Sequence, residues 1–147
     1  MTKSKYLLKC HKFYSDRIDS LKQEIKELRD SLTEEEFAQH PDVKFAARIR
    51  KATKEIIPEN PDKKEYQLHG NLKKYRRYKQ GLQRYRLFFV FSTKPPIILY
   101  LYLNDKSSLR KDGSKNDPYN VFSKFVEKKQ ILHDPSDPVI QRWIKNY

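Results

Sequence analysis

An acid-free stretch, residues 66–104, constrains the fold of this chain more than any other part of it. It contains eight Lys and Arg side chains and no Asp or Glu. Two runs within it, residues 84–92 and 97–103, are rich in aromatic and aliphatic side chains and are separated by a loop with two prolines, which predicts an antiparallel pair of strands. The second run is apolar on both faces, so we expect it at the centre of a sheet. A more highly charged run, residues 74–79, is expected as a further strand that ends at a glycine turn.

The N-terminal part of the chain has a helical period instead. Apolar residues recur at spacings of four and three, which predicts an amphipathic helix over residues 14–32. A second helix is predicted over residues 41–57, where the apolar spacing is the same and prolines stand at both ends. Thr33 and Glu36 form a capping-box pattern between the two helices. Residues 6–11 precede both helices and are expected as a short first strand.

The C-terminal third begins with a polar segment, residues 105–116, which predicts a surface loop. Asp117 followed by Pro118 is typical of the start of a helix, and we expect this helix to run to about Lys129. Residues 139–144 are expected to form a last helical turn.

Together these elements predict one α+β domain over residues 1–147, a length that suits a single core. Residues 1–65 supply a strand and a helical hairpin, residues 66–104 a basic sheet, and residues 105–147 a loop and a C-terminal helix. We expect the two N-terminal helices to pack on one face of a twisted, mainly antiparallel sheet of about four strands. The other face, with the C-terminal helix and the loop 105–117, is expected to form a basic cleft.

The net charge of +13 is concentrated in one region. Residues 1–65 carry 15 basic and 13 acidic side chains, so most of the excess lies in the acid-free stretch. A concentrated basic surface is typical of proteins that bind nucleic acid or another polyanion. We expect Arg84 and Arg86 on one face of a strand, where guanidinium groups bind phosphate through paired hydrogen bonds. The alternative is that these arginines pair with glutamates of the helices.

Several kinds of site are not expected. Cys10 is the only cysteine, so neither an intramolecular disulfide nor a cysteine-based zinc site is predicted. The four histidines have no metal-ligand spacing and the three glycines form no phosphate-binding motif, so we expect no metal or other cofactor. The chain has no 18-residue apolar run and no secretory signal, which predicts a cytoplasmic protein without a membrane partner.

A basic surface without metal ligands can still cleave RNA. The reaction needs a base for the 2′-hydroxyl, a proton donor for the leaving oxygen and cations for the phosphate, and Lys, Arg and Tyr can fill these roles. The rings of Tyr75, Tyr78 and Tyr85 could in addition stack on bases.

The motifs of residues 68–79 and 84–89, followed by Asn104-Asp105, Leu109-Arg110 and residues 117–124, closely resemble those of the YhaV family of toxins, within the RelE/ParE superfamily. The resemblance implies a RelE-like fold and a toxin of a type II toxin–antitoxin module that cleaves messenger RNA. It also implies a PrlF-like antitoxin with an AbrB-like domain as partner, through which alone the toxin would reach operator DNA.

Candidate site residues follow from the resemblance and from the charge pattern together. Asn104 and Asp105 are expected to support the site, with Asp105 orienting Arg110 or Lys115, although a plain turn cap is an equal alternative. The candidate catalytic residues are Arg86, Arg110, Lys115 and Tyr119. The candidate nucleic-acid-binding residues are Lys74, Arg76, Arg77, Lys79, Arg84 and Lys124.

The leading hypothesis is therefore a metal-independent endoribonuclease that cleaves messenger RNA, free or at the ribosome, and thereby inhibits translation and growth. Two other classes remain open from the residues. One is a toxin of the same fold that inhibits a protein target such as DNA gyrase, and the other is an RNA-binding protein without catalytic activity.

Overall fold

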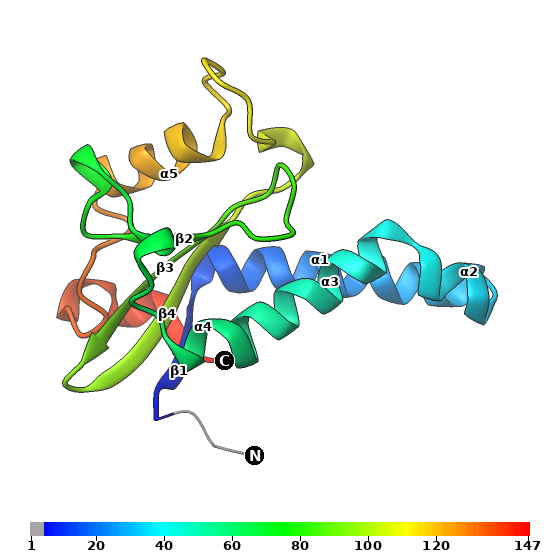
Figure 1. Cartoon of the computed structure of the whole chain (residues 1–147), viewed down its shortest axis with the longest axis horizontal. Coiled ribbons are helices and arrows are strands. Elements are labelled where there is room, and N and C mark those ends of the chain that lie inside the picture. The colour runs from blue at the N-terminus through cyan, green and yellow to red at the C-terminus, as the bar shows by residue number, and fades with distance from the viewer. Residues whose placement is uncertain (1–4) are drawn as a thin grey trace.

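A computed structural model describes residues 5–147, in which one sheet lies between two layers of helices and loops (Figure 1). The sheet has five strands in the order β2-β3-β4-β1-β5. β1 and β4 are parallel, while the other three neighbouring pairs are antiparallel. The strands are β1 (Leu7–His11), β2 (Arg76–Tyr78), β3 (Leu87–Thr93), β4 (Pro96–Leu103) and β5 (Ile144–Asn146).

The predicted α+β class is confirmed, and so is the central place of the apolar strand, because β4 has a neighbour on each side. The sheet has five strands rather than about four, since the tail adds β5 along the outer edge of β1. The helical turn expected over 139–144 is present as a 3₁₀-helix, Pro138–Trp143, and β5 follows it directly. Three residues are too few for an alternation of apolar and polar side chains to predict a strand. β5 forms because its backbone pairs with the free edge of β1.

The start of β3 also differs from the prediction. β3 begins at Leu87, not at Arg84, because the buried side chain of Asn104 takes the place of a neighbouring strand there. Asn104 Oδ1 accepts a hydrogen bond from the Arg86 N–H at 2.7 Å, and its Nδ2 donates to the Arg84 carbonyl at 3.2 Å. Arg84 and Arg86 are therefore held beside the end of the sheet rather than within it. β2 is likewise shorter than the expected 74–79.

The N-terminal helices form a hairpin that projects beyond the sheet (Figure 1). The predicted capping box between Thr33 and Glu36 is confirmed and starts a short helix between the two long ones. The second long helix continues as a π-helical turn, Ala52–Ile56, where the Tyr100 hydroxyl donates to the Thr53 carbonyl at 2.6 Å. The helices of this part are α1 (Lys12–Ser31), α2 (Glu34–Gln39), α3 (Pro41–Lys51) and α4 (Ile57–Glu59).

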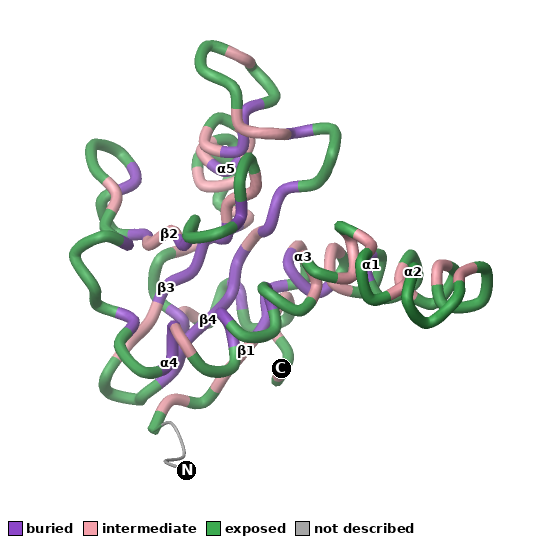
Figure 2. The backbone as a smooth tube through the Cα atoms, turned by 45° about the vertical axis from the view of Figure 1, so that its right-hand side comes forward, coloured by how far each residue is buried: buried purple, intermediate pink, exposed green. Residues whose placement is uncertain are grey.

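Each face of the sheet has its own core, and β3 and β4 are buried along most of their length (Figure 2). On one face, which we call the hairpin face, Leu87, Phe89 and Tyr100 pack against Tyr14 of α1 and Ile49 of α3. The other face is covered by the predicted C-terminal helix, α5 (Pro118–Glu127), and by the tail. We call it the α5 face, and its core includes Phe88, Leu99, Phe122, Ile131 and Ile140.

No helix within residues 5–147 is both long enough and apolar enough to cross a membrane.

Candidate active site

Tyr119, Arg77 and Arg110 meet at the β2 side of the α5 face, and we call these three residues the Tyr119 cluster. Tyr119 lies in the first turn of α5, where its ring packs edge-on against Phe88 with 5.5 Å between the ring centroids. The Tyr119 hydroxyl accepts a hydrogen bond from Arg77 Nη1 at 3.3 Å. The Arg110 guanidinium lies over the Tyr119 ring, 5.2 Å from its centroid. The phenol is therefore held between two permanent cations.

Two carboxylates orient Arg110. Its Nη1 donates to Asp117 Oδ1 at 2.7 Å, and its Nη2 donates to Asp112. The hydrogen bonds from Arg110 to Asp112 and then to Asp117 raise the pKa of Arg110 above its ordinary value. Because Asp117 is buried, its attraction for the guanidinium is less screened by water than that of exposed Asp112.

Asp117 does more than start α5. One of its oxygens accepts the Tyr119 N–H at 3.0 Å, which is the predicted N-cap, while the other also accepts the Lys111 N–H at 2.8 Å. A single buried carboxylate thus fixes the start of the helix that carries Tyr119, the loop and the Arg110 guanidinium. The Asp-Pro pair predicted the cap, but nothing in the local sequence indicated the pairing with Arg110.

Arg84 lies next to this cluster and is joined to it by backbone contacts. Arg84 Nε donates to the Arg110 carbonyl at 3.1 Å, and the Arg110 N–H donates to the Arg84 carbonyl at 2.9 Å. The amide of Asn104 ties the same segment to the following loop through a bond to the Ser108 carbonyl at 2.8 Å. Asn104 therefore fixes the backbone of Arg84 and Arg86 relative to this loop, and its supporting role in the site stays a prediction.

The guanidinium of Arg86 folds back onto the preceding turn. Its Nη1 donates to the Gln83 carbonyl at 2.5 Å and to the Tyr85 carbonyl at 2.8 Å. Its Nε is buried without a hydrogen-bond partner, and its Nη2 has no hydrogen-bond partner within residues 5–147. Among these residues, the Arg86 side chain makes no hydrogen bond to Arg77, Arg110 or Tyr119.

The two neighbouring arginines of β2 lie on opposite faces of the sheet. Arg77 is paired in register with Phe88 on the α5 face, whereas Arg76 is paired with Phe89 and lies over the Phe91 ring on the hairpin face. Arg76 also forms an ion pair with Asp62 at 3.2 Å. Successive residues of a strand point to opposite faces, so the expectation that both arginines line one binding surface is wrong.

The expected stacking of bases on tyrosine rings is also corrected in part. Tyr75 and Tyr78 are only 4% and 6% exposed, so their rings belong to the two cores. Burial raises the pKa of Tyr75 to about 12, as expected for a phenol enclosed by apolar side chains. Tyr85 is half-buried, and its ring contacts Phe45 with 4.5 Å between centroids.

Asp105 caps a turn and does not orient Arg110 or Lys115. It accepts hydrogen bonds from the Ser107 N–H at 2.9 Å and from the hydroxyls of Ser107 and Ser108. Burial raises the pKa of Asp105, but these hydrogen bonds outweigh that effect and the pKa is lowered. The alternative of a plain turn cap is therefore the one that the structure supports.

The remaining candidates are exposed lysines without an ion pair to any described residue. Lys115 lies in the loop before α5, and Lys124 lies on α5 itself. Lys74 and Lys79 lie before and after β2. The described residues contain no group of three or more His, Cys, Asp and Glu side chains placed to hold a metal ion.

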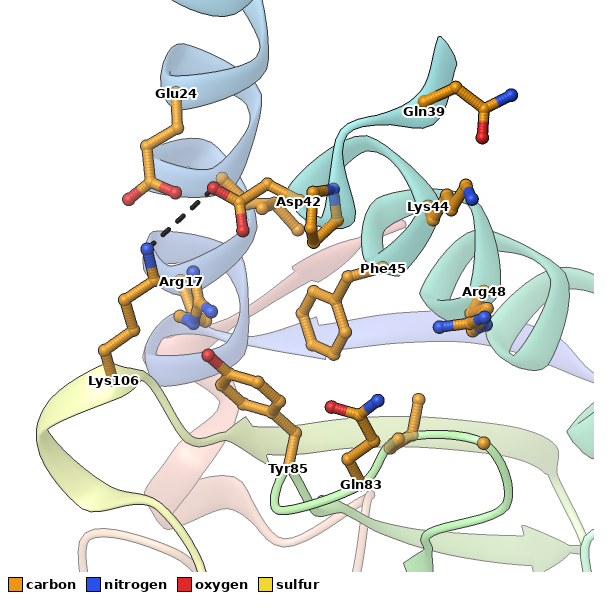
Figure 3. Close-up of a pocket in the computed structure, with 14 residues that line it drawn as sticks. Arg17, Glu24, Gln39, Asp42, Lys44, Phe45, Arg48, Gln83, Tyr85 and Lys106 are labelled. Atoms are coloured by element: carbon orange, nitrogen blue, oxygen red, sulfur yellow. Dashed lines mark ion pairs between the residues drawn. The ribbon is translucent and has the colours of Figure 1, made fainter. Parts of the chain in front are cut away.

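A pocket of about 380 Å³ lies between the helical hairpin and the turn that contains Gln83 and Tyr85 (Figure 3). The hairpin and the turn enclose it, and Tyr85, Phe45 and Gln83 point into it. Its lining also includes Glu24 and Asp42, and Asp42 forms an ion pair with Lys106 at 3.9 Å. We call this pocket the turn pocket, and none of the candidate catalytic residues lines it.

The structure is that of a small basic α+β protein in which a tyrosine contacts two arginines on one face of the sheet. Comparison with known proteins narrows this class. A family model described as a toxin with endonuclease activity, of a toxin–antitoxin system, matches residues 8–139. The chain therefore belongs to the YhaV toxin family, and it is the endonuclease toxin of a toxin–antitoxin system.

Two curated relatives support this assignment. The ribonuclease toxin YhaV of Escherichia coli K12 is 32% identical over 138 residues, which cover 90% of this chain and 86% of the relative. The toxin YhaV of Escherichia coli O157:H7 matches to the same extent. No solved structure matches the chain. Family membership favours the enzyme over the two alternative classes, the inhibitor of a protein target and the non-catalytic RNA binder.

Proposed function

We propose that this toxin is a metal-independent endoribonuclease that cleaves messenger RNA at the Tyr119 cluster. The observation that carries the proposal is the position of the Tyr119 hydroxyl, which is bonded to Arg77 at 3.3 Å while Arg110 lies over its ring. Two cations can bind the non-bridging oxygens of a phosphate and stabilise the charge that develops in the transition state. A phenol between them is placed to transfer a proton to or from the same phosphate ester.

The reaction that fits these groups is attack by the 2′-hydroxyl of RNA on the adjacent phosphorus. The new bond joins the 2′-oxygen to phosphorus, and the bond from phosphorus to the 5′-oxygen breaks. The products are a 2′,3′-cyclic phosphate and a 5′-hydroxyl. In this proposal Tyr119 gives its proton to the departing 5′-oxygen, and Lys115 is assigned as the group that accepts the proton of the 2′-hydroxyl.

The other basic residues would hold the RNA on either side of this phosphate. Arg86 Nη2 is free of hydrogen bonds to the described residues and is the group that we assign to a phosphate oxygen of the substrate. The side chains that we assign to the RNA backbone are Lys74, Lys79, Arg84 and Lys124. Arg76 is left out of this set, because it lies on the hairpin face and is paired with Asp62.

Cleavage of matched oligonucleotides tests the proposal. We expect purified toxin to cut a single-stranded RNA at the same rate with and without EDTA, and to leave a 2′,3′-cyclic phosphate. The same RNA with a 2′-deoxy nucleotide at the mapped cleavage position should resist cleavage there. Cleavage of that deoxy position, or full inhibition by EDTA, would contradict the proposed chemistry.

We propose further that the fold is RelE-like and that the toxin acts in the cytoplasm, on free messenger RNA or at the ribosome. The antitoxin that the module implies is proposed to be PrlF-like with an AbrB-like domain, and to carry the complex to operator DNA. The sequence motifs that resemble the YhaV family support these points. Sequencing the reading frame beside the toxin gene tests the proposed antitoxin. An antitoxin without an AbrB-like N-terminal segment would rule out the PrlF-like assignment.

A further inference from the structure

An apolar groove runs between the two long helices of the hairpin, away from the Tyr119 cluster. Its cavity volume is about 440 Å³, and side chains of α1, α3 and the C-terminal Tyr147 line it. Ile18 and Ile25 of α1 face Ala46 of α3 across it, and all three are only partly buried by the rest of the protein. We call this feature the hairpin groove. A volume of this size is typical of sites that hold a bound ligand or peptide side chains.

The charged residues that line the hairpin groove are all basic. They are Lys22, Arg50 and Lys54, and the lining contains no Asp or Glu. None of the three forms an ion pair with a described residue. Lys54 instead lies over the Tyr147 ring, 3.5 Å from its centroid.

Lys54 is close enough to Arg50 and Lys22 to be repelled by both. Burial lowers the pKa of Lys54, and the like charges of Arg50 and Lys22 lower it further, while Cys10 opposes them. Repulsion of this kind is relieved when a negative group binds between the cations. The hairpin groove therefore combines a partly exposed apolar floor with a rim of three basic side chains. These side chains have no ion pair with a described residue.

The turn pocket, on the same hairpin, does not combine an apolar floor with a wholly basic rim. That pocket lies on the same helices, but its lining includes Glu24 and Asp42, and Asp42 is paired with Lys106. The hairpin groove also differs from the Tyr119 cluster, because an apolar floor gives no contact to a sugar-phosphate backbone. The floor and the rim together fit an amphipathic protein segment whose charged face is acidic.

We infer that the hairpin groove binds an acidic amphipathic helix of the antitoxin. Membership of a toxin–antitoxin family supplies a partner protein, and the groove supplies the chemistry by which that partner is recognised. A helix placed along a groove buries apolar side chains at positions i, i+3, i+4 and i+7, so its Asp and Glu side chains would lie against the basic rim. The antitoxin would then hold the toxin on the face opposite to the one that carries Tyr119.

Charge reversal at the rim, Lys22→Glu with Arg50→Glu, tests the inference. Both side chains are exposed and unpaired, so the fold should tolerate the change. A matched control is Lys26→Glu with Lys51→Glu, which makes the same charge change on the same helices outside the groove. Isothermal titration calorimetry with the antitoxin encoded beside the toxin gene should give at least about tenfold weaker binding for the rim variant. The control should change affinity by less than about threefold.

A second variant, Ile25→Glu, tests the apolar floor and should also weaken antitoxin binding. Cleavage of RNA by each variant without antitoxin should remain at the wild-type rate, which shows that the fold is intact. Antitoxin affinities that are equal for wild type, rim variant and floor variant would overturn the inference. The inference would also be overturned by a rim variant that binds antitoxin normally but cleaves RNA more slowly, because the rim would then serve RNA. It would likewise be overturned if the wild type were a dimer in light scattering and the rim variant a monomer, because the groove would then bind a second copy of the chain. Antitoxin affinity is measured independently of cleavage, so failure of the proposed ribonuclease chemistry would leave this test valid.

Discussion

The two faces of the sheet use tyrosine in different ways. On the hairpin face, the hydroxyls of Tyr14 and Tyr147 are 2.8 Å apart, and Thr53 lies 3.1 Å from Tyr147. Burial raises the pKa of Tyr14 well above its ordinary value, so this phenol is held neutral. On the α5 face, the hydroxyl of Tyr119 is bonded to a guanidinium instead. The Tyr14 hydroxyl is bonded to a neutral hydroxyl and supports the fold, whereas the Tyr119 hydroxyl is bonded to a cation, and we propose that it transfers a proton.

The same contrast separates the two arginines of β2. Arg76 and Arg77 are neighbours with the same charge, yet one pairs with an exposed carboxylate over the hairpin face and the other contacts Tyr119. Because successive side chains of a strand point to opposite faces of the sheet, Arg77 lies beside Tyr119 and Arg76 does not. This pair provides a matched control within the protein.

The largest expected effect is that of Tyr119→Phe, which removes the hydroxyl and keeps the ring against Phe88. We expect the single-turnover rate of RNA cleavage to fall by about 1000-fold, within the range for loss of a general acid or base. Circular dichroism and thermal unfolding should match those of the wild type. A variant that retains more than a tenth of the wild-type rate would remove Tyr119 from the chemistry.

Replacement of the two arginines should have a smaller effect that depends on the face. Arg77→Ala removes a cation beside the scissile phosphate and should slow cleavage by about 100-fold, as for the loss of one transition-state donor. Arg76→Ala makes the same charge change on the other face and should slow cleavage by less than about threefold. Equal losses in both variants would mean that bulk charge, and not the cluster, determines the rate.

Tyr147→Phe tests the hairpin face and should affect stability instead of activity. It removes the partner of the Tyr14 hydroxyl, which is fully buried and is left without a hydrogen bond. Urea denaturation should show a free energy of unfolding lower by about 1–3 kcal/mol. The RNA cleavage rate of the folded variant should be unchanged, and a loss of activity comparable to that of Tyr119→Phe would erase the distinction between the faces.

The smallest effect, on the free energy of unfolding, is expected from the titration of His11. This side chain joins α1 on the hairpin face to the segment after α5. Its Nδ1 accepts the Phe13 N–H at the start of α1, and its Nε2 lies 2.9 Å from the Gln130 carbonyl beyond α5, to which Nε2–H donates. Burial lowers the pKa of His11 below 6.5, although the bond to Gln130 and the charge of Asp16 oppose the shift. The neutral form is therefore the one that the fold stabilises.

A lowered pKa in the folded state sets the direction of the pH dependence. The contribution of neutral His11 is complete above about pH 6.5 and is lost as the pH falls below that value and through the folded-state pKa. We expect the free energy of unfolding to decrease over this acidic range. His11→Asn keeps a capping side chain but cannot titrate, so its decrease should be shallower, and a slope equal to that of the wild type would assign the titration to other groups.

Much of the fold could be predicted from the sequence because its signals are local. The helical spacing, the capping box at Thr33, the Asp117 cap and the apolar strand over 97–103 each depend on neighbouring residues, and all four are confirmed. β5 could not be predicted in this way, since its three residues become a strand only by pairing with β1.

The candidate site was predictable in composition but not in its pairings. Arg110 and Tyr119 are candidates from the sequence motifs, whereas the contact of Tyr119 with Arg77 spans 42 positions of the sequence and depends on how α5 lies on the sheet. The role of Asn104 in displacing Arg86 from β3 is equally non-local. The separation of Arg76 from Arg77 was available from strand alternation alone.

The proton donated by Tyr119 can be tested directly with a substrate whose leaving group does not need it. RNA that carries sulfur in place of the 5′-bridging oxygen at the scissile phosphate releases a thiolate, which leaves without protonation. Single-turnover cleavage of this RNA should be equally fast for the wild type and for Tyr119→Phe, although the variant cleaves ordinary RNA about 1000-fold more slowly. A variant that is as impaired on the sulfur substrate as on ordinary RNA would contradict the assignment of Tyr119 as the proton donor.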